Sequence, residues 1–221
     1  QQELFAPPTR RPLPNYTARY LGEDRIAGRA AEVIGVADPE SGRLLRVFWI
    51  DKESNIILRQ DQLNWQGQLV SSTEFLRVSL LASPPDPGLS RQEADLLLSP
   101  GQEMPLEALS EAVGFEAVMP REVPHGFVFT GSFLVECPCG CGTAMAHLRF
   151  SDQVRGFSVF ELKHNDSACD FARQLAPRAD GKVFSLSPAL NACVVDCNGV
   201  LVVVIGDLPE EHMERLAQAF R

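Results

Sequence analysis

The sequence predicts an α+β protein built from two antiparallel sheets, and three observations support this class. Short runs typical of β-strands, separated by turn residues, fill the first 82 positions. The segment SPPDPG at 83–88 then interrupts the pattern, because proline cannot continue a central strand. A second β-rich region follows and ends in an amphipathic helical pattern. We therefore divide the chain into a first domain at 1–82, a linker with a short helix at 83–104, and a second domain at 105–221.

The first domain is predicted to be an antiparallel meander. The chain reads as β from Ala18, with strands expected at 30–36, 44–50, 56–59 and 69–81 and the turn sequences DPESG and DKESN between the earlier ones. In the last strand apolar and polar residues alternate, which indicates one wet face. The candidates for an apolar face, as sheet core or as a lipid lining, are Val47, Trp49, Val78 and Leu80.

The second domain begins with helices and continues as a sheet. Ser90 and Glu93 form a capping box that predicts a short helix at 91–98, and Pro105 opens a helix at 106–113. Strands are expected from 127, at 143–150, at 156–162 and within 192–205, where Asn198-Gly199 predicts a hairpin turn. A closing helix, capped by Asp207 or Leu208, is indicated by apolar residues at helical spacing, Met213, Leu216, Ala217 and Phe220.

The charge distribution argues against nucleic-acid binding. Residues 1–83 carry ten basic and ten acidic side chains, so the net charge of −9 belongs to the remainder, with 10 basic and 19 acidic side chains. An acidic domain without a lysine or arginine cluster repels phosphates. No apolar run approaches the roughly 20 residues of a membrane helix. The start of the chain lacks the pattern of a signal peptide, which predicts a soluble protein that is either cytosolic or already processed.

All six cysteines lie in the second domain: Cys137, Cys139, Cys141, Cys169, Cys193 and Cys197. If the run CPCGC is extended, its three thiols share one strand face and lie about 6.6 Å apart along it. Cys193 and Cys197 are too far apart in an extended strand to bridge each other. One economical arrangement joins each early cysteine to a later one, although the sequence cannot choose among the possible connectivities.

Three interpretations of these cysteines stay open. Structural disulfides suit an even count in a small domain and require an oxidising compartment. A zinc ion or an iron–sulfur cluster is the alternative, with Cys137, Cys139, Cys141 and Cys169 as ligands. A redox or persulfide-handling role is the third, because a Cys-x-Cys disulfide is strained and labile.

The sequence favours a binding protein over an enzyme, with no catalytic residue and no cofactor expected outside the cysteine alternative. It contains no nucleophile elbow, phosphate-binding loop, His-Glu-x-x-His or dinucleotide fingerprint. The four histidines are isolated, and a structural role is expected for each: His125, His147, His164 and His212. Asp51 and Glu53 form a carboxylate pair that we interpret as turn chemistry.

Several motifs, in order, resemble the MucB/RseB family. In the first domain these are YLGEDRIAGRAAEVIGV at 20–36, FWIDKES at 48–54, ILR at 57–59 and EF at 74–75. In the second domain they are VPHGF at 123–127, LRFSD at 148–152, FSVF at 157–160 and VIGDLP at 204–209. Each motif is weak alone, but their shared order covers about four fifths of the chain.

The resemblance implies a periplasmic, non-enzymatic regulator of the envelope stress response. Family members hold the periplasmic part of a membrane anti-sigma factor, shield it from proteolysis and release it when lipid-type signals arrive. Their first domain is similar to the lipoprotein carrier LolA, an open antiparallel barrel over helices, and their smaller second domain is a sheet with a packed helix. The resemblance thus implies an anti-sigma factor or other envelope protein as partner, or a lipid or lipoprotein acyl chain.

Two departures from the family pattern add expectations. Tyr20 comes almost at the start, so the first domain is expected to hold only the second half of the LolA-like barrel, either as a fragment or with its edge completed by another chain. An incomplete barrel exposes unpaired backbone, which also predicts a possible homodimer through the sheet edge. The cysteines are not a feature of the family's familiar members. A lipid carrier of LolA type and a metal or redox protein therefore remain the alternative functions.

Overall fold

The computed structural model describes residues 15–39, 41–64, 66–81, 101–164 and 169–221. The chain separates into two compact units that divide between Val78 and Ser79. The predicted helix at 91–98 lies outside the described residues. Both units consist mainly of antiparallel strands, and the described helices all belong to the second unit, which confirms the α+β class.

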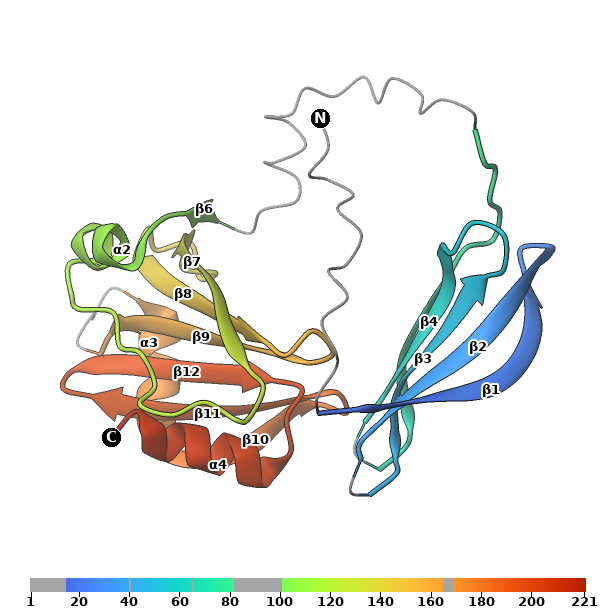
Figure 1. Cartoon of the computed structure of the whole chain (residues 1–221). Helices are drawn as coiled ribbons and strands as arrows, with labels where there is room; N and C mark the ends of the chain where they lie inside the picture. The colour runs from blue at the N-terminus through green and yellow to red at the C-terminus, as the bar shows by residue number, and fades with distance from the viewer. Residues whose placement is uncertain (1–14, 40, 65, 82–100, 165–168) are drawn as a thin grey trace. The chain divides into compact units, whose positions relative to one another are not determined.

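The first unit is one sheet of five antiparallel strands that follow one another in chain order (Figure 1). Its strands are β1 (Thr17–Ile26), β2 (Arg29–Ala37), β3 (Leu44–Asp51), β4 (Ile57–Leu63) and β5 (Leu69–Glu74). This order is the meander predicted from the turn residues. Among the described residues, no strand pairs with the outer side of β1 or of β5, so both are sheet edges.

The last strand of this sheet is shorter than the predicted strand at 69–81. The pairing of β5 with β4 ends where Glu74 lies opposite Arg59, and the Phe75 amide then donates to the Leu58 carbonyl at 2.9 Å. The β4 strand begins at Ile57, and the Ile56 carbonyl before it accepts a hydrogen bond from the Asp51 amide, so β4 offers no further partner to the ladder. The alternating pattern beyond Glu74 therefore belongs to a segment without strand pairing, in which the Leu76 side chain is 89% exposed.

The second unit contains a seven-stranded antiparallel sheet in the order β10-β11-β12-β9-β8-β7-β6. The strands are β6 (Gln102–Glu103), β7 (Val128–Glu136), β8 (Ala144–Ser151), β9 (Gly156–Lys163), β10 (Asp180–Ser187), β11 (Leu190–Cys197) and β12 (Val200–Gly206). We expected this sheet to be the smaller of the two, and among the described strands it is the larger. Residues 102–103, which we assigned to the linker from the sequence, pair with β7 as strand β6.

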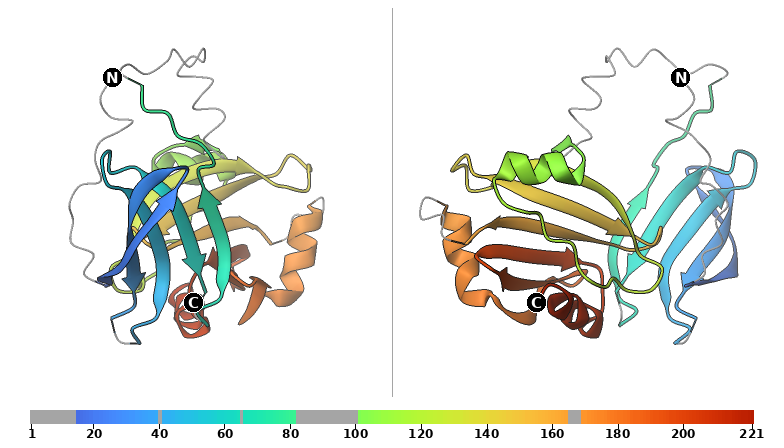
Figure 2. Two further views of the ribbon diagram at one scale, coloured as in Figure 1. Left: turned by 90° about the vertical axis from the view of Figure 1, so that its right-hand side faces the viewer. Right: turned by 60° about the vertical axis from the view of Figure 1, so that its left-hand side comes forward.

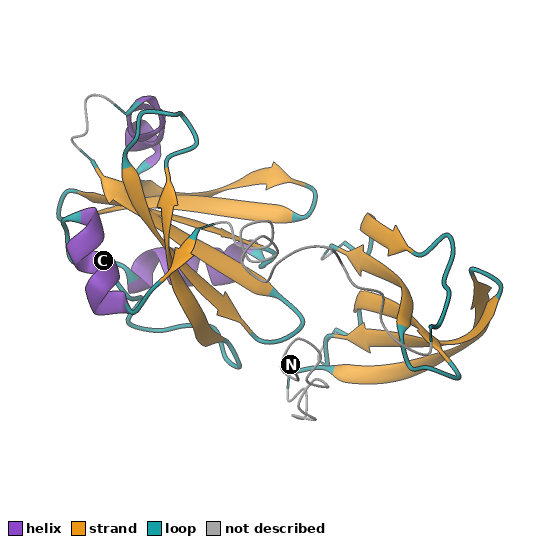
Figure 3. Cartoon of the chain, turned by 90° about the horizontal axis from the view of Figure 1, so that it is seen from above, coloured by secondary structure: helices purple, strands orange, loops and turns teal. Residues whose placement is uncertain are grey.

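Helices cover both faces of the second sheet (Figures 2 and 3). On one face α2 (Leu106–Val113) and α4 (Glu210–Ala219) contribute to one apolar core, and on the other α3 (Asp170–Leu175) contributes to a second. Strand β12 lies between them: Val202 faces the first core, whereas Leu201 and Val203 face the second. Its continuous apolar sequence is therefore explained by burial on both sides.

Local patterns in the second unit are largely confirmed. The helix α2 has the predicted bounds, and Asn198 and Gly199 turn the chain between β11 and β12 with positive φ values of 54° and 85°. The closing helix buries Met213 and Leu216 as expected, although its N-cap is Pro209. Besides β6, the elements α3 and β10 were not predicted. The helix α3 has only six residues, too few to show a helical period, and β10 is a largely exposed edge strand.

Candidate functional site

Arg29 joins two turns of the first sheet. Its Nε and Nη2 donate to both carboxylate oxygens of Asp51 at 2.8–2.9 Å, and Nη2 also donates to Glu53 at 2.8 Å. The Asp51 side chain is 1% exposed and that of Glu53 is 81% exposed, so the bidentate Asp51 pair is the buried part. The hydrogen bonds from Arg29 lower the pKa of Asp51. The carboxylate pair that we interpreted as turn chemistry is therefore also the anchor of this arginine.

Trp49 lies at the centre of a second set of polar contacts in this sheet. Its indole Nε1 donates to Asp24 at 2.9 Å, and the Arg59 guanidinium lies 4.4 Å from its ring centroid. Arg59 in turn donates to both oxygens of Asp61 at 2.8–2.9 Å, and the Ser72 hydroxyl donates to Asp61 at 2.6 Å. These contacts link β1, β3, β4 and β5. The motifs that resemble the family in this unit thus include the residues that hold its sheet together.

The four apolar residues singled out from the sequence do not form one exposed surface. Val47 is buried, and Trp49 and Val78 pack against a small core made by Ile26, Ala31 and Leu58. Leu80 is half exposed. The structure therefore divides these candidates between sheet core and surface.

Exposed apolar side chains of the first unit gather on its edge strands and after β5. They are Tyr20 and Leu21 on β1, Leu69 on β5, and Phe75 and Leu76 beyond it. Ile56 and Ile57, at the start of β4, are also exposed. Edge strands with apolar side chains and free backbone groups are surfaces on which another chain can pair. This surface could have been predicted from the meander pattern in the sequence, because the first and last strands of a meander are the edges of its sheet.

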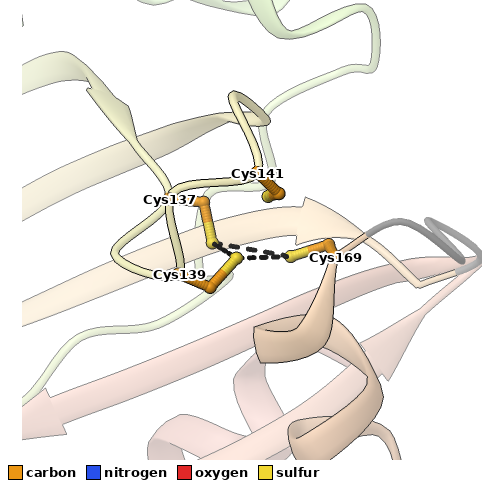
Figure 4. A group of neighbouring side chains, drawn as sticks. All are labelled: Cys137, Cys139, Cys141 and Cys169. Carbon is orange, nitrogen blue, oxygen red and sulfur yellow. Dashed lines mark hydrogen bonds between the residues drawn. The ribbon is translucent and has the colours of Figure 1, made fainter.

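Four of the six cysteines converge in the second unit (Figure 4). Their sulfur atoms, from Cys137, Cys139, Cys141 and Cys169, lie within 4.8 Å of one another. The CPCGC run is not extended, because these residues form the loop between β7 and β8. Gly140 and Gly142 have φ values of 75° and 76° there, which turn the chain back on itself. The thiols therefore surround one point instead of lining a strand.

The environments of these thiols differ. Cys137 and Cys169 are buried, which raises the pKa of each thiol, whereas Cys139 is exposed. Hydrogen bonds from the thiols of Cys141 and Cys137 and from the Phe171 amide lower the pKa of Cys139 to about 6. The cluster therefore combines an exposed thiol of lowered pKa with two buried thiols of raised pKa.

The two remaining cysteines lie apart from this cluster. Cys193 and Cys197 contribute to the core on the α4 side of the sheet, whereas Cys137 and Cys169 belong to the core on the α3 side. The Cys193 thiol donates to the Met213 carbonyl at 3.8 Å, and the Cys197 thiol donates to the Phe220 carbonyl at 2.7 Å. All six thiols are free, so the pairing of each early cysteine with a later one is not the arrangement found. The sheet separates the two groups.

Two histidines and one buried glutamate of the second unit contact neighbouring residues of the fold. His147 stacks on Phe160 with ring centroids 4.3 Å apart, its Nε2 bonds Ser158, and burial lowers its pKa to about 4. His164 pairs with Asp196 near the turn between β11 and β12. Glu161 is fully buried and accepts hydrogen bonds from the Val118 amide, and burial raises its pKa to about 8. Each group thus contacts its neighbours in the fold, while the buried Nδ1 of His147 has no hydrogen-bond partner among the described residues.

The fold and these sites define a class: a sheet-built protein with an open-edged first unit and a helix-covered second unit. Within it, residues 2–96 match the MucB/RseB N-terminal domain. The chain is 30% identical over 209 residues to the sigma factor AlgU regulatory protein MucB of Pseudomonas aeruginosa, covering 93% of this chain and 60% of that protein. It is 28% identical over 208 residues to the sigma-E factor regulatory protein RseB of Escherichia coli K12, covering 93% and 59%.

The solved structures of MucB are similar in fold. The structure of MucB in complex with MucA(peri) has a TM-score of 0.59 at 23% identity and covers 96% of this chain and 71% of that one. A structure of MucB alone has a TM-score of 0.57 at 23% identity, covering 92% and 62%. The comparisons confirm the resemblance to the MucB/RseB family that the motifs predicted. The chain spans about three fifths of the length of the curated relatives that it matches.

None of the helices in the described residues is both long and apolar enough to cross a bilayer.

Proposed function

We propose that this chain is a non-enzymatic regulatory module that acts in the periplasm and holds the periplasmic segment of an anti-sigma factor. Its relatives are regulatory proteins of sigma factors, and one solved relative is MucB in complex with MucA(peri). Non-covalent binding of a protein segment requires an accessible surface and no catalytic group. The observation that carries the proposal is the exposed first edge of the five-stranded sheet.

The strand β1 suits this role because it is long and accessible. It has ten residues, of which only Ile26 is buried, and it presents Tyr20 and Leu21 to solvent. A partner segment that pairs with β1 gains backbone hydrogen bonds along the strand and packs apolar side chains on these two residues. The network around Trp49 and Asp24 fixes β1 to the rest of the sheet, so the edge is presented on a rigid support.

Calorimetric titration tests this proposal. The probe is the purified periplasmic domain of the membrane anti-sigma factor from the same source organism, and we expect one partner bound per chain. Tyr20→Asp places a charge on the β1 edge and should weaken binding about tenfold, which corresponds to about 1.4 kcal/mol. Leu186→Asp, at a position 51% exposed on β10, is the matched control and should bind normally.

Two outcomes contradict the proposal. Absence of binding by the unaltered chain overturns the anti-sigma factor as partner. Equal weakening by Tyr20→Asp and Leu186→Asp overturns β1 as its binding surface. Light scattering on the unaltered chain addresses the homodimer alternative, because a stable dimer that Tyr20→Asp converts to monomer would assign the β1 edge to a second copy instead.

We propose further that a lipid-type signal releases the partner through the apolar segment after β5. Phe75 and Leu76 are 51% and 89% exposed there. Vesicles of anionic phospholipid added to the complex should then displace the partner. Stoichiometric lipid in the native mass spectrum of the purified chain, with no partner binding, would instead support a lipid carrier of LolA type and overturn the regulatory function.

A further inference from the structure

We infer that Cys137, Cys139, Cys141 and Cys169 form a binding site for a single zinc ion, with the four thiolates as ligands. The inference is independent of the proposed anti-sigma factor binding. It rests on the distances between the sulfurs, on the shape of the loop that carries three of them, and on the composition of the cluster.

The spacing of the sulfurs fits four ligands around one ion. The Sγ atoms of Cys137 and Cys139 lie 3.2 Å apart, those of Cys137 and Cys169 lie 3.5 Å apart, and those of Cys139 and Cys169 lie 3.8 Å apart (Figure 4). Thiolates that bond zinc at about 2.3 Å in a tetrahedron lie about 3.8 Å from one another. A disulfide requires two sulfurs about 2.05 Å apart, and none of these three pairs is that close.

The loop between β7 and β8 is shaped to direct its thiols inward. The Cys137 amide donates to the Thr143 carbonyl at 2.9 Å and closes the loop, and the Gly140 amide donates to the Cys137 carbonyl at 3.1 Å. A Cβ at Gly140 or Gly142 would meet no neighbouring atom, so the positive φ and not space explains these two glycines. The turns at these two glycines bring Cys139 and Cys141 back beside Cys137.

The fourth thiol comes from a distant part of the chain. Cys169 precedes α3, its sulfur accepts a hydrogen bond from the Ala172 amide at 3.4 Å, and its side chain is fully buried. Amide donors to sulfur are the contacts that orient thiolate ligands and offset their charge. The site would thus fasten the β7–β8 loop to α3 on the face of the sheet that this helix covers.

The composition of the cluster selects the metal. In the described part of the chain, no histidine or carboxylate joins the four sulfurs. Soft thiolates favour zinc, copper(I) and iron–sulfur clusters, and four thiolates around one centre suit zinc. An iron–sulfur cluster would distribute the ligands over several irons and hold their sulfurs farther apart. Binding places one Zn²⁺ among four thiolates and releases the protons of those thiols that are not yet ionised, with no electron transferred, so no oxidant is required.

Elemental analysis of the whole chain tests the inference. The protein is expressed in zinc-supplemented medium and purified without a histidine tag, and we expect one zinc per chain. Replacement by Co²⁺ should give the visible absorption of a tetrahedral cobalt–thiolate centre. Removal of zinc with a chelator should make four additional thiols reactive in the native protein.

Matched variants separate the site from the other cysteines. The double variant Cys139→Ser, Cys141→Ser should lose the zinc while keeping the fold, because Cys139 is exposed and Cys141 is partly exposed. Cys193→Ser, at a buried position on the other side of the sheet, should keep one zinc per chain. Circular dichroism of each variant checks the fold.

Three results would overturn the inference. One is a native protein without zinc whose four thiols all react. A second is a mass lower by two hydrogens for each disulfide among these cysteines. The third is one zinc per chain in the double variant. Since none of these measurements involves the anti-sigma factor, failure here leaves the proposed function untouched.

Discussion

The two sheets of this protein are stabilised in different ways. The first has no described helix over it, and charged pairs such as Arg29–Asp51 and Arg59–Glu74 connect its strands. The second is covered by helices on both faces and holds two apolar cores. The uncovered sheet leaves its faces open to a partner, whereas both faces of the second sheet are packed against helices of its own chain. The comparison teaches that helices packed on a sheet decide its role. The first sheet, without described helices, has surface for a partner, whereas the second gains stability by packing against its own helices.

The largest expected effect follows from burial on both faces of β12. Leu201→Ala removes a fully buried side chain, and the loss of apolar burial plus a residual cavity should cost about 2–5 kcal/mol in the free energy of unfolding. Leu69→Ala, at a position 56% exposed on β5, should change that free energy by less than about 0.5 kcal/mol. Denaturant titration of both variants provides the comparison. Equal losses would contradict the contrast between the two units.

The buried acid of the second unit gives a pH dependence. Because burial raises the pKa of Glu161 from 4.5 to about 8, the folded state binds its proton more tightly than the unfolded state. This stabilisation is complete below pH 4.5 and is lost as the pH rises through about 8. Glu161→Gln cannot ionise, so its stability relative to the unaltered chain should increase between these two pH values, on the order of a few kcal/mol. Thermal unfolding of both proteins at several pH values measures this stability difference. A difference that does not change with pH would contradict the raised pKa of Glu161.

A smaller effect is expected from the charged pairs of the first unit. Arg29→Lys keeps the positive charge but loses the planar, bidentate contact with Asp51. We expect lower stability of the first unit, by less than Leu201→Ala costs the second, because Arg29 remains partly exposed to solvent. The difference between variant and unaltered chain should shrink at high salt, which screens the pair. Urea unfolding at low and high ionic strength checks this, and a salt-independent loss would indicate packing instead of charge.

The features that could be predicted from the sequence are those that depend on residues close to one another in the chain. The Asn198-Gly199 turn, the helix α2 and the apolar face of α4 depend on neighbours within a few positions, so their patterns were sufficient. The strand predicted at 69–81 was too long because its alternation says nothing about where the partner strand begins. The helix α3 was missed because its first-turn cap is the side chain of Cys169, which is not a common capping residue.

By itself, the sequence determined the α+β class, the meander order of the first unit and the absence of familiar catalytic motifs, since each depends on local periodicity or on residue type. Only the tertiary structure decided which cysteines meet. The β7–β8 loop brings three thiols together through its glycines, and the position of α3 adds Cys169, while the sheet keeps Cys193 and Cys197 on its other side. Spacing along the chain cannot show this, because contacts between distant residues are set by the packing of whole elements and not by their neighbours in sequence.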